Sequence, residues 1–535
     1  MISKVYIKDY LRGPYTLIDN SSGTQTVINE PVVPRKWLPG STISADGNVI
    51  AHEKHNAIVG IIDFVNHTGQ GFNARGVPLY LFHPLDKAYP PFIVASKERC
   101  TSNMIAVVAF EHWNDRWARG GILRRLGAVG DRNVERTALI MRAGFSAPAV
   151  CDVPPLMPLI TESWDRCFNI DPAGCEDVDD VFAWRACDDG KYEFAIAIAD
   201  VATIVAEASI MDIEARARGT SVYEEGVAII PMLPRTISEH AASLRADGKP
   251  RACLALCWII DADVCVSAPR WKQLTLTVEH AYTYESFDDD RETAELLTKF
   301  LRAVGAGDAL ADSHAAVAAA MILYNKTAGE LLARSGRGLL RAHAGSAATP
   351  YAALADATGI QELRWLGAAA GRYVASTDAE RYHAGLGLGA YAHASSPLRR
   401  YADLVNQRAL KAILFGAPEP HNDPELPTWL NTRCSAAAAL ERDLWFAKNI
   451  KTHALSHACG VVLRVRDCDV RILVTVYVPE WRRKIRCVGT ARVGDRVNVR
   501  VFCDLRAVRW DDRIVAHAEL FESRGGHSPT PKTPP

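Results

Sequence analysis

The spacing of apolar residues changes along the chain, and these changes limit the folds available to it. From Ala57 to about Leu126, and again from 151 to about 285, short apolar runs between turn residues predict β-strands. From Arg291 to about His453 apolar residues recur every three or four positions, which predicts helices. Between Gly460 and Leu520 the strand pattern returns. We therefore expect an α+β multidomain protein in which small β-barrels flank a unit whose strands precede its helices.

Composition and charge exclude several classes of protein. A chain of 535 residues is too long for one hydrophobic core, and 48% hydrophobic with 23% charged residues is ordinary for globular proteins. A net charge of −1 means that any nucleic-acid site must be a local basic patch. The cysteines form no C-x-x-C pair, which favours a reducing intracellular compartment. The longest apolar run, Ala315 to Tyr324, is about half the length needed to span a bilayer. The first residues lack the apolar core of a secretion signal. We therefore expect a soluble protein.

An acidic run between Asp171 and Asp180 is the first candidate site. It holds four aspartates and a glutamate within ten residues, and such crowded carboxylates need a cation or water around them. Oxygen ligands indicate Mg²⁺ or Mn²⁺. Asp177 and Asp179 alternate with Val178, so both carboxylates project together while Val178 points into the core. Two divalent ions at such a run suit phosphodiester hydrolysis.

A calcium-binding loop and a metal-free surface turn are two other interpretations of the acidic run. A calcium-binding EF-hand loop is excluded, because counting from Asp177 places Phe182 where the loop needs glycine and Asp188 where it needs glutamate. An acidic surface turn without metal is about as common as a metal site, so the run alone leaves both possibilities open.

A second candidate site lies in the segment YAHASSPLRRYADL, residues 391–404. Ser396 followed by Pro397 predicts a helix that begins there, with Ser396 as its cap. The free N–H groups at a helix start bind anions, and Arg399 with Arg400 would strengthen a phosphate site. The alternative is a structural helix in which Arg399 pairs with Asp403.

Aromatic and basic residues in the two expected barrels could bind single-stranded nucleic acid. Tyr80 and Phe82 share a strand face and could stack on bases, although a place in the core is at least as probable. A loop from Trp481 to Arg486 combines an aromatic ring with four cations, although such loops are more often plain hairpins. The tail from Ser523 to Pro535 is rich in Pro, Gly and Ser and is expected to be disordered.

The acidic run NIDPAGCEDVDD, the segments IADVATIV and RGTSVYEEGVAIIPMLPRTISEHAASL, and YAHASSPLRRYADL together resemble the RNB domain of RNase II and exosome-subunit exoribonucleases. GIIDFVNHTG, PLDKAYPPFIV and GGILRRLGAVGD resemble the cold-shock OB domain that precedes it in the eukaryotic exosome subunit, and the last barrel is similar to an S1 domain. The expected domains are a region of uncertain structure (1–55), a cold-shock-like domain with linker (56–150), an RNB catalytic domain (151–453), an S1-type domain (454–522) and the tail (523–535).

The resemblance implies a processive 3′-to-5′ exoribonuclease that hydrolyses single-stranded RNA to nucleoside 5′-monophosphates with two Mg²⁺ ions, for which Mn²⁺ can substitute. It also implies roles for individual residues. Asp171, Asp177 and Asp180 match metal ligands, and Asp179, Arg399 and Glu441 match catalytic positions. Tyr223 matches the tyrosine that stacks on the 3′-terminal nucleotide, and Arg400 and His393 are further substrate-binding candidates.

The chain also departs from the family pattern. Gln407 stands where the family usually has histidine, and the proline that commonly follows His343 is absent. Only one cold-shock domain is clear, and no N-terminal PIN nuclease is expected. Two alternatives stay open: a non-catalytic RNA-binding or regulatory protein with the same fold, and a metal-dependent endonuclease or DNase. Protein partners in an RNA-decay complex are not predictable from the sequence.

Overall fold

The computed structural model describes residues 2–11, 13–19, 22, 24–29, 36–66, 70–149, 153, 162–261, 266–307, 311–345, 351–366, 370–451, 454–468, 471–508 and 510–520. The tail expected to be disordered, from Ser523 to Pro535, lies outside these residues. The chain divides into two compact units. We call residues 1–145, 351–364 and 442–535 the barrel unit, and residues 146–350 and 365–441 the sheet unit.

The barrel unit begins with a five-stranded sheet in the region of uncertain structure. Its strand order is β3-β2-β1-β4-β5. Val5 and Trp37 from this region share one hydrophobic cluster with Ile58 and Phe92 of the following barrel, so the two β-structures have a common core. The strands are β1 (Ser3–Ile7), β2 (Tyr15–Asp19), β3 (Gln25–Ile28), β4 (Thr42–Ile43) and β5 (Val49–Ala51).

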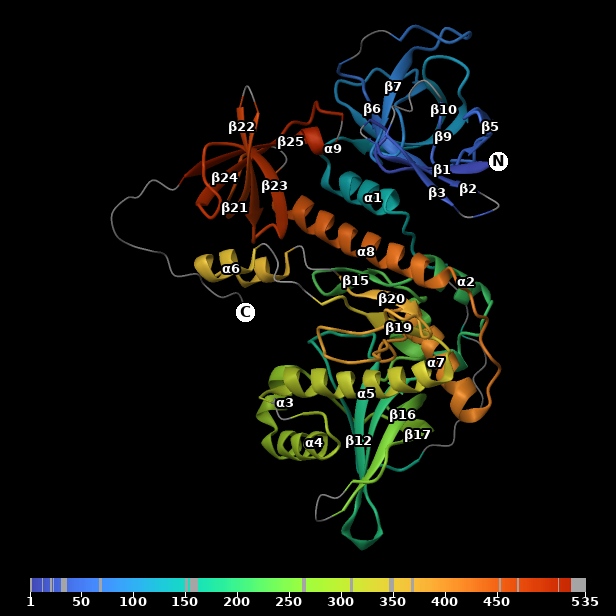
Figure 1. Ribbon diagram of the computed structural model, residues 1–535, viewed down its shortest axis with the longest axis vertical. Coiled ribbons are helices and arrows are strands. Elements are labelled where there is room, and N and C mark those ends of the chain that lie inside the picture. Colours follow the sequence, from blue (N-terminus) through green and yellow to red (C-terminus); the bar gives the residue numbers. More distant parts are fainter. Residues whose placement is uncertain are drawn as a thin grey trace, which may run out of the picture. The chain divides into compact units, whose positions relative to one another are not determined.

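Two closed five-stranded barrels confirm the predicted OB-type domains (Figure 1). The first comprises β6 (Ile58–Ile62), β7 (Leu79–Pro84), β8 (Phe92–Ala95), β9 (Met104–His112) and β10 (Ala118–Ala128), followed by α1 (Arg132–Arg142). The second comprises β21 (Ser456–Cys468), β22 (Arg471–Val478), β23 (Arg483–Val488), β24 (Arg496–Cys503) and β25 (Ile514–Leu520). The short helices α6 (Ala352–Thr358) and α9 (Trp510–Arg513) also belong to the barrel unit.

The structure decides between the alternatives for the barrel aromatics. Tyr80 and Phe82 are buried in the first barrel, which confirms the core alternative and leaves no stacking surface. Trp481 lies in the turn between the antiparallel strands β22 and β23, which confirms the hairpin alternative. Its ring is only 1% exposed and packs edge-on against Phe446, so it is a core ring and cannot stack on a base.

The cations around Trp481 remain on the surface. Lys484 and Arg486 are exposed, because residues two apart in a strand share a face, and Arg482 is exposed in the turn before β23. The guanidinium of Arg482 lies 4.5 Å from the centre of the Trp445 ring. Exposed cations are therefore gathered on β23 and the turn before it.

The sheet unit is built on a six-stranded sheet with the order β17-β16-β13-β12-β11-β18. Nearly every residue of β13 and β16 is buried, as their continuous apolar runs predicted. The sheet strands are β11 (Arg166–Ile170), β12 (Asp180–Ala186), β13 (Tyr192–Ala199), β16 (Pro250–Ile260), β17 (Arg270–Thr277) and β18 (His280–Tyr282). Two small ribbons pair β14 (Val222–Glu224) with β15 (Val227–Ile230) and β19 (Leu339–Ala342) with β20 (Arg372–Ala375).

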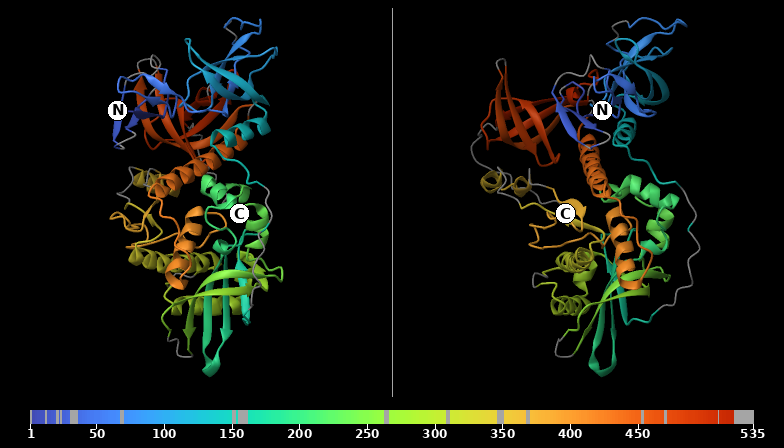
Figure 2. Two further views of the ribbon diagram at one scale, coloured as in Figure 1. Left: turned by 90° about the vertical axis from the view of Figure 1, so that its right-hand side faces the viewer. Right: turned by 45° about the vertical axis from the view of Figure 1, so that its right-hand side comes forward.

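Helices cover both faces of this sheet (Figure 2). Alternation along β12 sends Phe182 and Trp184 into a cluster with α4 and α5, and Val181 and Ala183 into a cluster with α7 and α8. The helices are α2 (Ile210–Arg218), α3 (Tyr284–Asp289), α4 (Arg291–Ala303), α5 (Ser313–Ser335), α7 (Tyr401–Phe415) and α8 (Leu426–Asn449), which confirm the helical pattern expected after Arg291. No helix among the described residues is long and apolar enough to cross a membrane.

Helix α5 also supports the segment that carries the second candidate site. A Cβ atom added at Gly329 would lie 2.8 Å from the backbone nitrogen of Ala392 and 2.9 Å from the Cα of Tyr391. Glycine in the middle of a helix is normally unfavourable. Here it allows the backbone of residues 391–392 to pass directly over the helix.

We predict that Gly329→Ala destabilises the protein, although alanine is the better helix former by about 1 kcal/mol. The new methyl group would press on backbone atoms, and overpacking of this kind costs about 1–3 kcal/mol. Denaturant unfolding should therefore give a lower free energy of unfolding for Gly329→Ala. Ala318→Gly is the control: at this exposed position of α5 the change in the free energy of unfolding reports only the difference in helix propensity between alanine and glycine. A gain in stability for Gly329→Ala would contradict the close approach.

Candidate active site

The acidic run forms the connection between the antiparallel strands β11 and β12. Asp171 follows the last residue of β11, and Asp180 is the first residue of β12. Val178 is buried as predicted. Its N–H donates to Ser243 Oγ at 3.0 Å, and its carbonyl accepts from the Leu244 N–H at 2.9 Å. These contacts fix the backbone between Asp177 and Asp179.

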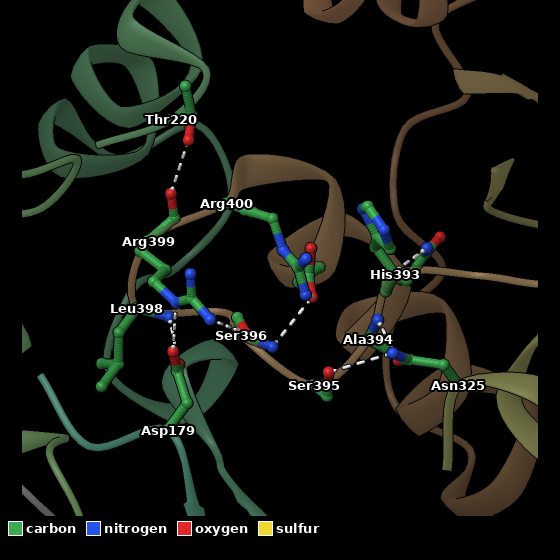
Figure 3. A network of polar contacts seen from close by, with 12 residues as sticks. Asp179, Thr220, Asn325, His393, Ala394, Ser395, Ser396, Leu398, Arg399 and Arg400 are labelled. Carbon is green, nitrogen blue, oxygen red and sulfur yellow. Dashed lines mark hydrogen bonds and ion pairs between the residues drawn. The ribbon is translucent and has the colours of Figure 1, made fainter. Parts of the chain in front are cut away.

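Asp179 joins the two candidate sites (Figure 3). Its carboxylate is buried, with Oδ1 accepting from the Leu398 N–H at 2.9 Å and Oδ2 accepting from Arg399 Nε at 3.2 Å. Arg399 and Asp179 are 220 residues apart in the sequence. The Arg399 side chain remains 45% exposed, although Asp179 holds its Nε and its Nη2 donates to Ser396 Oγ at 3.0 Å.

The structure corrects the predicted helix start at Ser396 and Pro397. Helix α7 begins at Tyr401, because the preceding backbone pairs with another segment: the Arg399 carbonyl accepts from Ser221, and the Tyr401 N–H donates to Gly219. Residues that bond across the chain in this way are unavailable to a helix. The N–H expected to be free for an anion at Leu398 is also already donated to Asp179.

Asp403 holds the turn that precedes α7. Its Oδ1 accepts from the Ser396 N–H and from Arg400 Nη2, both at 2.8 Å. The predicted alternative, a pair between Arg399 and Asp403, is therefore wrong: Arg400 takes this carboxylate, which leaves Arg399 for Asp179. The two adjacent arginines thus face different partners.

Asn325 on α5 is a contributor that the sequence analysis missed. Its Oδ1 accepts from the Ala394 N–H at 2.8 Å, and its Nδ2 donates to Ser395 Oγ at 3.0 Å. Asn325 is 3% exposed. A buried amide must find partners, and these lie on the segment that leads to Arg399. The available signal was a polar residue inside an otherwise apolar helical run.

Tyr223 and Glu441 meet beside Asp177. The Tyr223 hydroxyl donates to Asp177 Oδ2 at 2.8 Å, and the Tyr223 backbone N–H donates to Glu441 Oε1 at the same distance. Burial, reinforced by Asp177, raises the pKa of the Tyr223 hydroxyl, so the phenol stays protonated. Glu441 therefore positions the strand that carries Tyr223 in this arrangement.

His393 and Arg400 are both engaged within the protein. His393 Nδ1 lies 2.9 Å from the Tyr373 hydroxyl, and burial, together with Arg400 and Arg341, lowers the pKa of His393 well below its ordinary value. The imidazole is therefore neutral. Arg400 contacts Asp403 as described above. Their proposed contacts with a substrate remain predictions.

The aspartates carry the electrostatic strain expected of a crowded carboxylate cluster. Burial raises the pKa of Asp179 to about 7, against the opposing effects of Arg399 and the Leu398 N–H. Burial also raises the pKa of Asp180 well above the usual range, with Asp171 and Asp179 adding repulsion. Asp171 shifts in the same direction, chiefly through burial. A nearby cation would favour the charged form of all three.

The donor chemistry fits Mg²⁺ or Mn²⁺ with a partial protein shell. Among the described residues, no group of three or more His, Cys, Asp or Glu is arranged to hold a metal ion by itself. Mg²⁺ is usually bound by one or two carboxylates and completes its shell with water and substrate phosphate. The buried Asn169 Oδ1 has no hydrogen-bond partner among the described residues, while Asn169 Nδ2 donates to Asp171 Oδ2 at 2.8 Å. Hard oxygen donors are therefore gathered at Asp171.

Comparison with protein families matches two segments. Residues 162–304 and 306–416 match the RNB domain, and residues 79–144 match the Dis3-like cold-shock domain 2. The chain is 27% identical to exoribonuclease 2 of Aeromonas hydrophila over 60% of this chain and 59% of that protein. It is 28% identical to ribonuclease R of Helicobacter pylori over 56% of this chain and 57% of that protein.

Other curated relatives are matched over a smaller share. The exosome complex exonuclease RRP44 homolog A of Arabidopsis thaliana is 28% identical over 50% of this chain and only 32% of that protein. The chain therefore spans between about a third and three fifths of the length of these relatives.

Solved structures share the fold over nearly the whole chain. RNase R of Mycoplasma genitalium, in complex with ribose-methylated single-stranded RNA, superposes with a TM-score of 0.70 at 14% identity, covering 97% of this chain and all of that chain. Yeast Ssd1, described as a pseudonuclease, superposes with a TM-score of 0.64 at 16% identity, covering 94% of this chain and 81% of that chain. At these identities the likeness extends to the fold alone.

The raised pKa values predict how stability depends on pH. Between pH about 4 and 7 the folded protein holds a proton on Asp179 that the unfolded chain has released, so stability falls as pH rises. The raised pKa values of Asp171 and Asp180 act in the same direction. Thermal unfolding of the metal-free protein should therefore begin at lower temperature at pH 8 than at pH 5. Millimolar Mg²⁺ or Mn²⁺ should reverse the loss at pH 8, because an ion that binds only the folded state stabilises it.

Asp180→Asn should reduce both the pH dependence and the metal-induced rise in melting temperature. Asp188→Asn, at an exposed position just beyond the far end of β12, is the matched control and should behave like the unaltered protein. Equal metal stabilisation of Asp180→Asn and the unaltered protein would contradict a metal site at the acidic run.

Proposed function

Because the chain contains an RNB domain and belongs with the RNB-domain proteins, we propose that it hydrolyses single-stranded RNA from the 3′ end, processively, releasing nucleoside 5′-monophosphates. The observation that carries this proposal is the complete set of four aspartates beside Arg399. Single-stranded RNA is named in the description of the similar RNase R complex. In this proposal Asp171, Asp177 and Asp180 hold Mg²⁺.

The aspartates need a divalent ion because carboxylates and an RNA phosphate repel each other. When bound, Mg²⁺ supplies the positive charge that activates water and stabilises the leaving oxygen. Arg399 is placed to assist: Asp179 anchors its Nε and Ser396 Oγ accepts from its Nη2, while the side chain stays 45% exposed to an incoming phosphate oxygen. Asp179 orients that arginine through Oδ2 while Oδ1 holds the Leu398 N–H.

Tyr223 is proposed to stack on the 3′-terminal base. Its ring is held from both ends, by Asp177 at the hydroxyl and by Glu441 at the backbone. A ring fixed in this way loses little conformational freedom when a base binds to it. The exposed cations on β23 support a further contact with RNA, since a positive surface follows the backbone without reading its sequence.

The second candidate function is a non-catalytic RNA-binding protein. The observation in its favour is the shared fold with yeast Ssd1, which is described as a pseudonuclease. The hydrogen bond from Tyr223 to Asp177 and the ion pair from Arg399 to Asp179 would also persist in a protein that never binds metal. We prefer the nuclease, because such a protein has no need for a cluster in which burial and neighbouring carboxylates raise the pKa values of Asp171 and Asp180.

The test is an RNA shortening assay with 5′-labelled single-stranded RNA and Mg²⁺. We expect a ladder that shortens one nucleotide at a time from the 3′ end. Asp179→Asn should lower the rate by about a hundredfold or more, since removing one group that stabilises charge at a reaction centre has that effect. EDTA should abolish shortening.

Controls separate the alternatives. Asp188→Asn should shorten RNA at the unaltered rate. Circular RNA of the same sequence should survive, and its cleavage would instead identify an endonuclease. RNA that is bound but never shortened by the unaltered protein would establish the non-catalytic alternative.

A further inference from the structure

A pocket in the barrel unit is lined by none of the aspartates of the acidic run. It has a volume of about 270 Å³ and is lined by α1, the end of α8 and the strands β24 and β25 with their connection. Its apolar lining comes from Phe446, Ile450, Leu505 and Ile514. Apolar walls around a few polar groups are typical of small-molecule sites.

A buried carboxylate reaches this pocket from α1. Glu135 is 7% exposed, and its Oε1 accepts from Arg513 Nη1 at 2.8 Å and from the Gly130 N–H at 3.0 Å. The other oxygen, Oε2, is buried without a hydrogen-bond partner among the described residues. A buried acceptor of this kind is costly unless a donor reaches it. The pocket therefore offers an acceptor to a ligand with an N–H group.

Cations dominate the exposed part of the lining. Arg513 is paired with Glu135, which is the one carboxylate among the described lining residues. Arg132 and Lys451 of the lining are exposed. Arg132 is the first residue of α1, where the helix dipole disfavours a cation. An anionic ligand accounts for a cation at that position.

We propose that this pocket binds a nucleoside 5′-monophosphate whose base carries an amino group. The base lies against Phe446 and Ile450 and donates from its amine to Glu135 Oε2, while the phosphate meets Arg132 and Lys451. The amine requirement favours adenosine and cytidine over uridine monophosphates. Uracil has no exocyclic amine, and its N3–H lies between two carbonyl oxygens that would repel the carboxylate. The inference does not depend on the proposed nuclease activity, although that activity would produce such ligands.

Isothermal titration calorimetry of the full chain in EDTA tests this proposal. We expect AMP and CMP to bind, and UMP to bind at least about tenfold more weakly, since one unmet hydrogen bond in a buried site is worth that much. The double variant Arg132→Glu with Lys451→Glu should lose at least about tenfold in affinity for AMP. Asp179→Asn should bind AMP like the unaltered protein.

Arg442→Glu is the matched control, because Arg442 is an exposed arginine of α8 outside the pocket lining. Its affinity for AMP should not change. Adenosine and ribose 5-phosphate, titrated separately, should each bind more weakly than AMP. The proposal is overturned if no nucleotide binds, if UMP binds as tightly as AMP, or if Arg442→Glu loses as much affinity as the double variant. Failure of the RNA shortening assay would leave these results unaffected.

Discussion

The buried carboxylate of Asp179 is the interaction on which the candidate active site depends. A charge in the interior needs partners. The Asp179 carboxylate accepts hydrogen bonds from the Leu398 N–H and from Arg399 Nε, which lie on a segment some two hundred residues away. That segment is fixed in turn by Asp403 and by Asn325 of α5. The acidic run and the arginine therefore form one site through tertiary contacts that neither segment could make alone.

Much of the fold could be predicted because burial imposes a period on the sequence. The apolar runs of β13 and β16 and the helical spacing of α4 and α5 are local signals, and each element formed as expected. The predicted start of α7 was wrong because the Ser-Pro signal at Ser396 is local, whereas the hydrogen bonds between residues 399–401 and 219–221 are not. The hairpin at Trp481 was the commoner of two alternatives, but no local pattern distinguishes a core ring from a stacking one.

In the candidate site too, local sequence signals were predictable and contacts between distant segments were not. All four aspartates were identified from their spacing and from family resemblance, and the structure brings them together with Arg399 and Tyr223. The partner of each arginine could not be predicted, since Arg399 and Arg400 are adjacent and chemically identical. Burial of the carboxylates, which raises their pKa values, also became visible only in three dimensions. It explains why a divalent cation suits this position better than water does.

A crystal structure with Mn²⁺ and a ribose-methylated oligonucleotide would show whether metal and the RNA 3′ end meet at the acidic run. Anomalous scattering would locate the ions. We expect Mn²⁺ on carboxylate oxygens of Asp171, Asp177 or Asp180, with the phosphate nearest the 3′ end in contact with Arg399 and the last base against Tyr223. Mn²⁺ elsewhere, or a 3′ end bound away from these residues, would contradict this expectation.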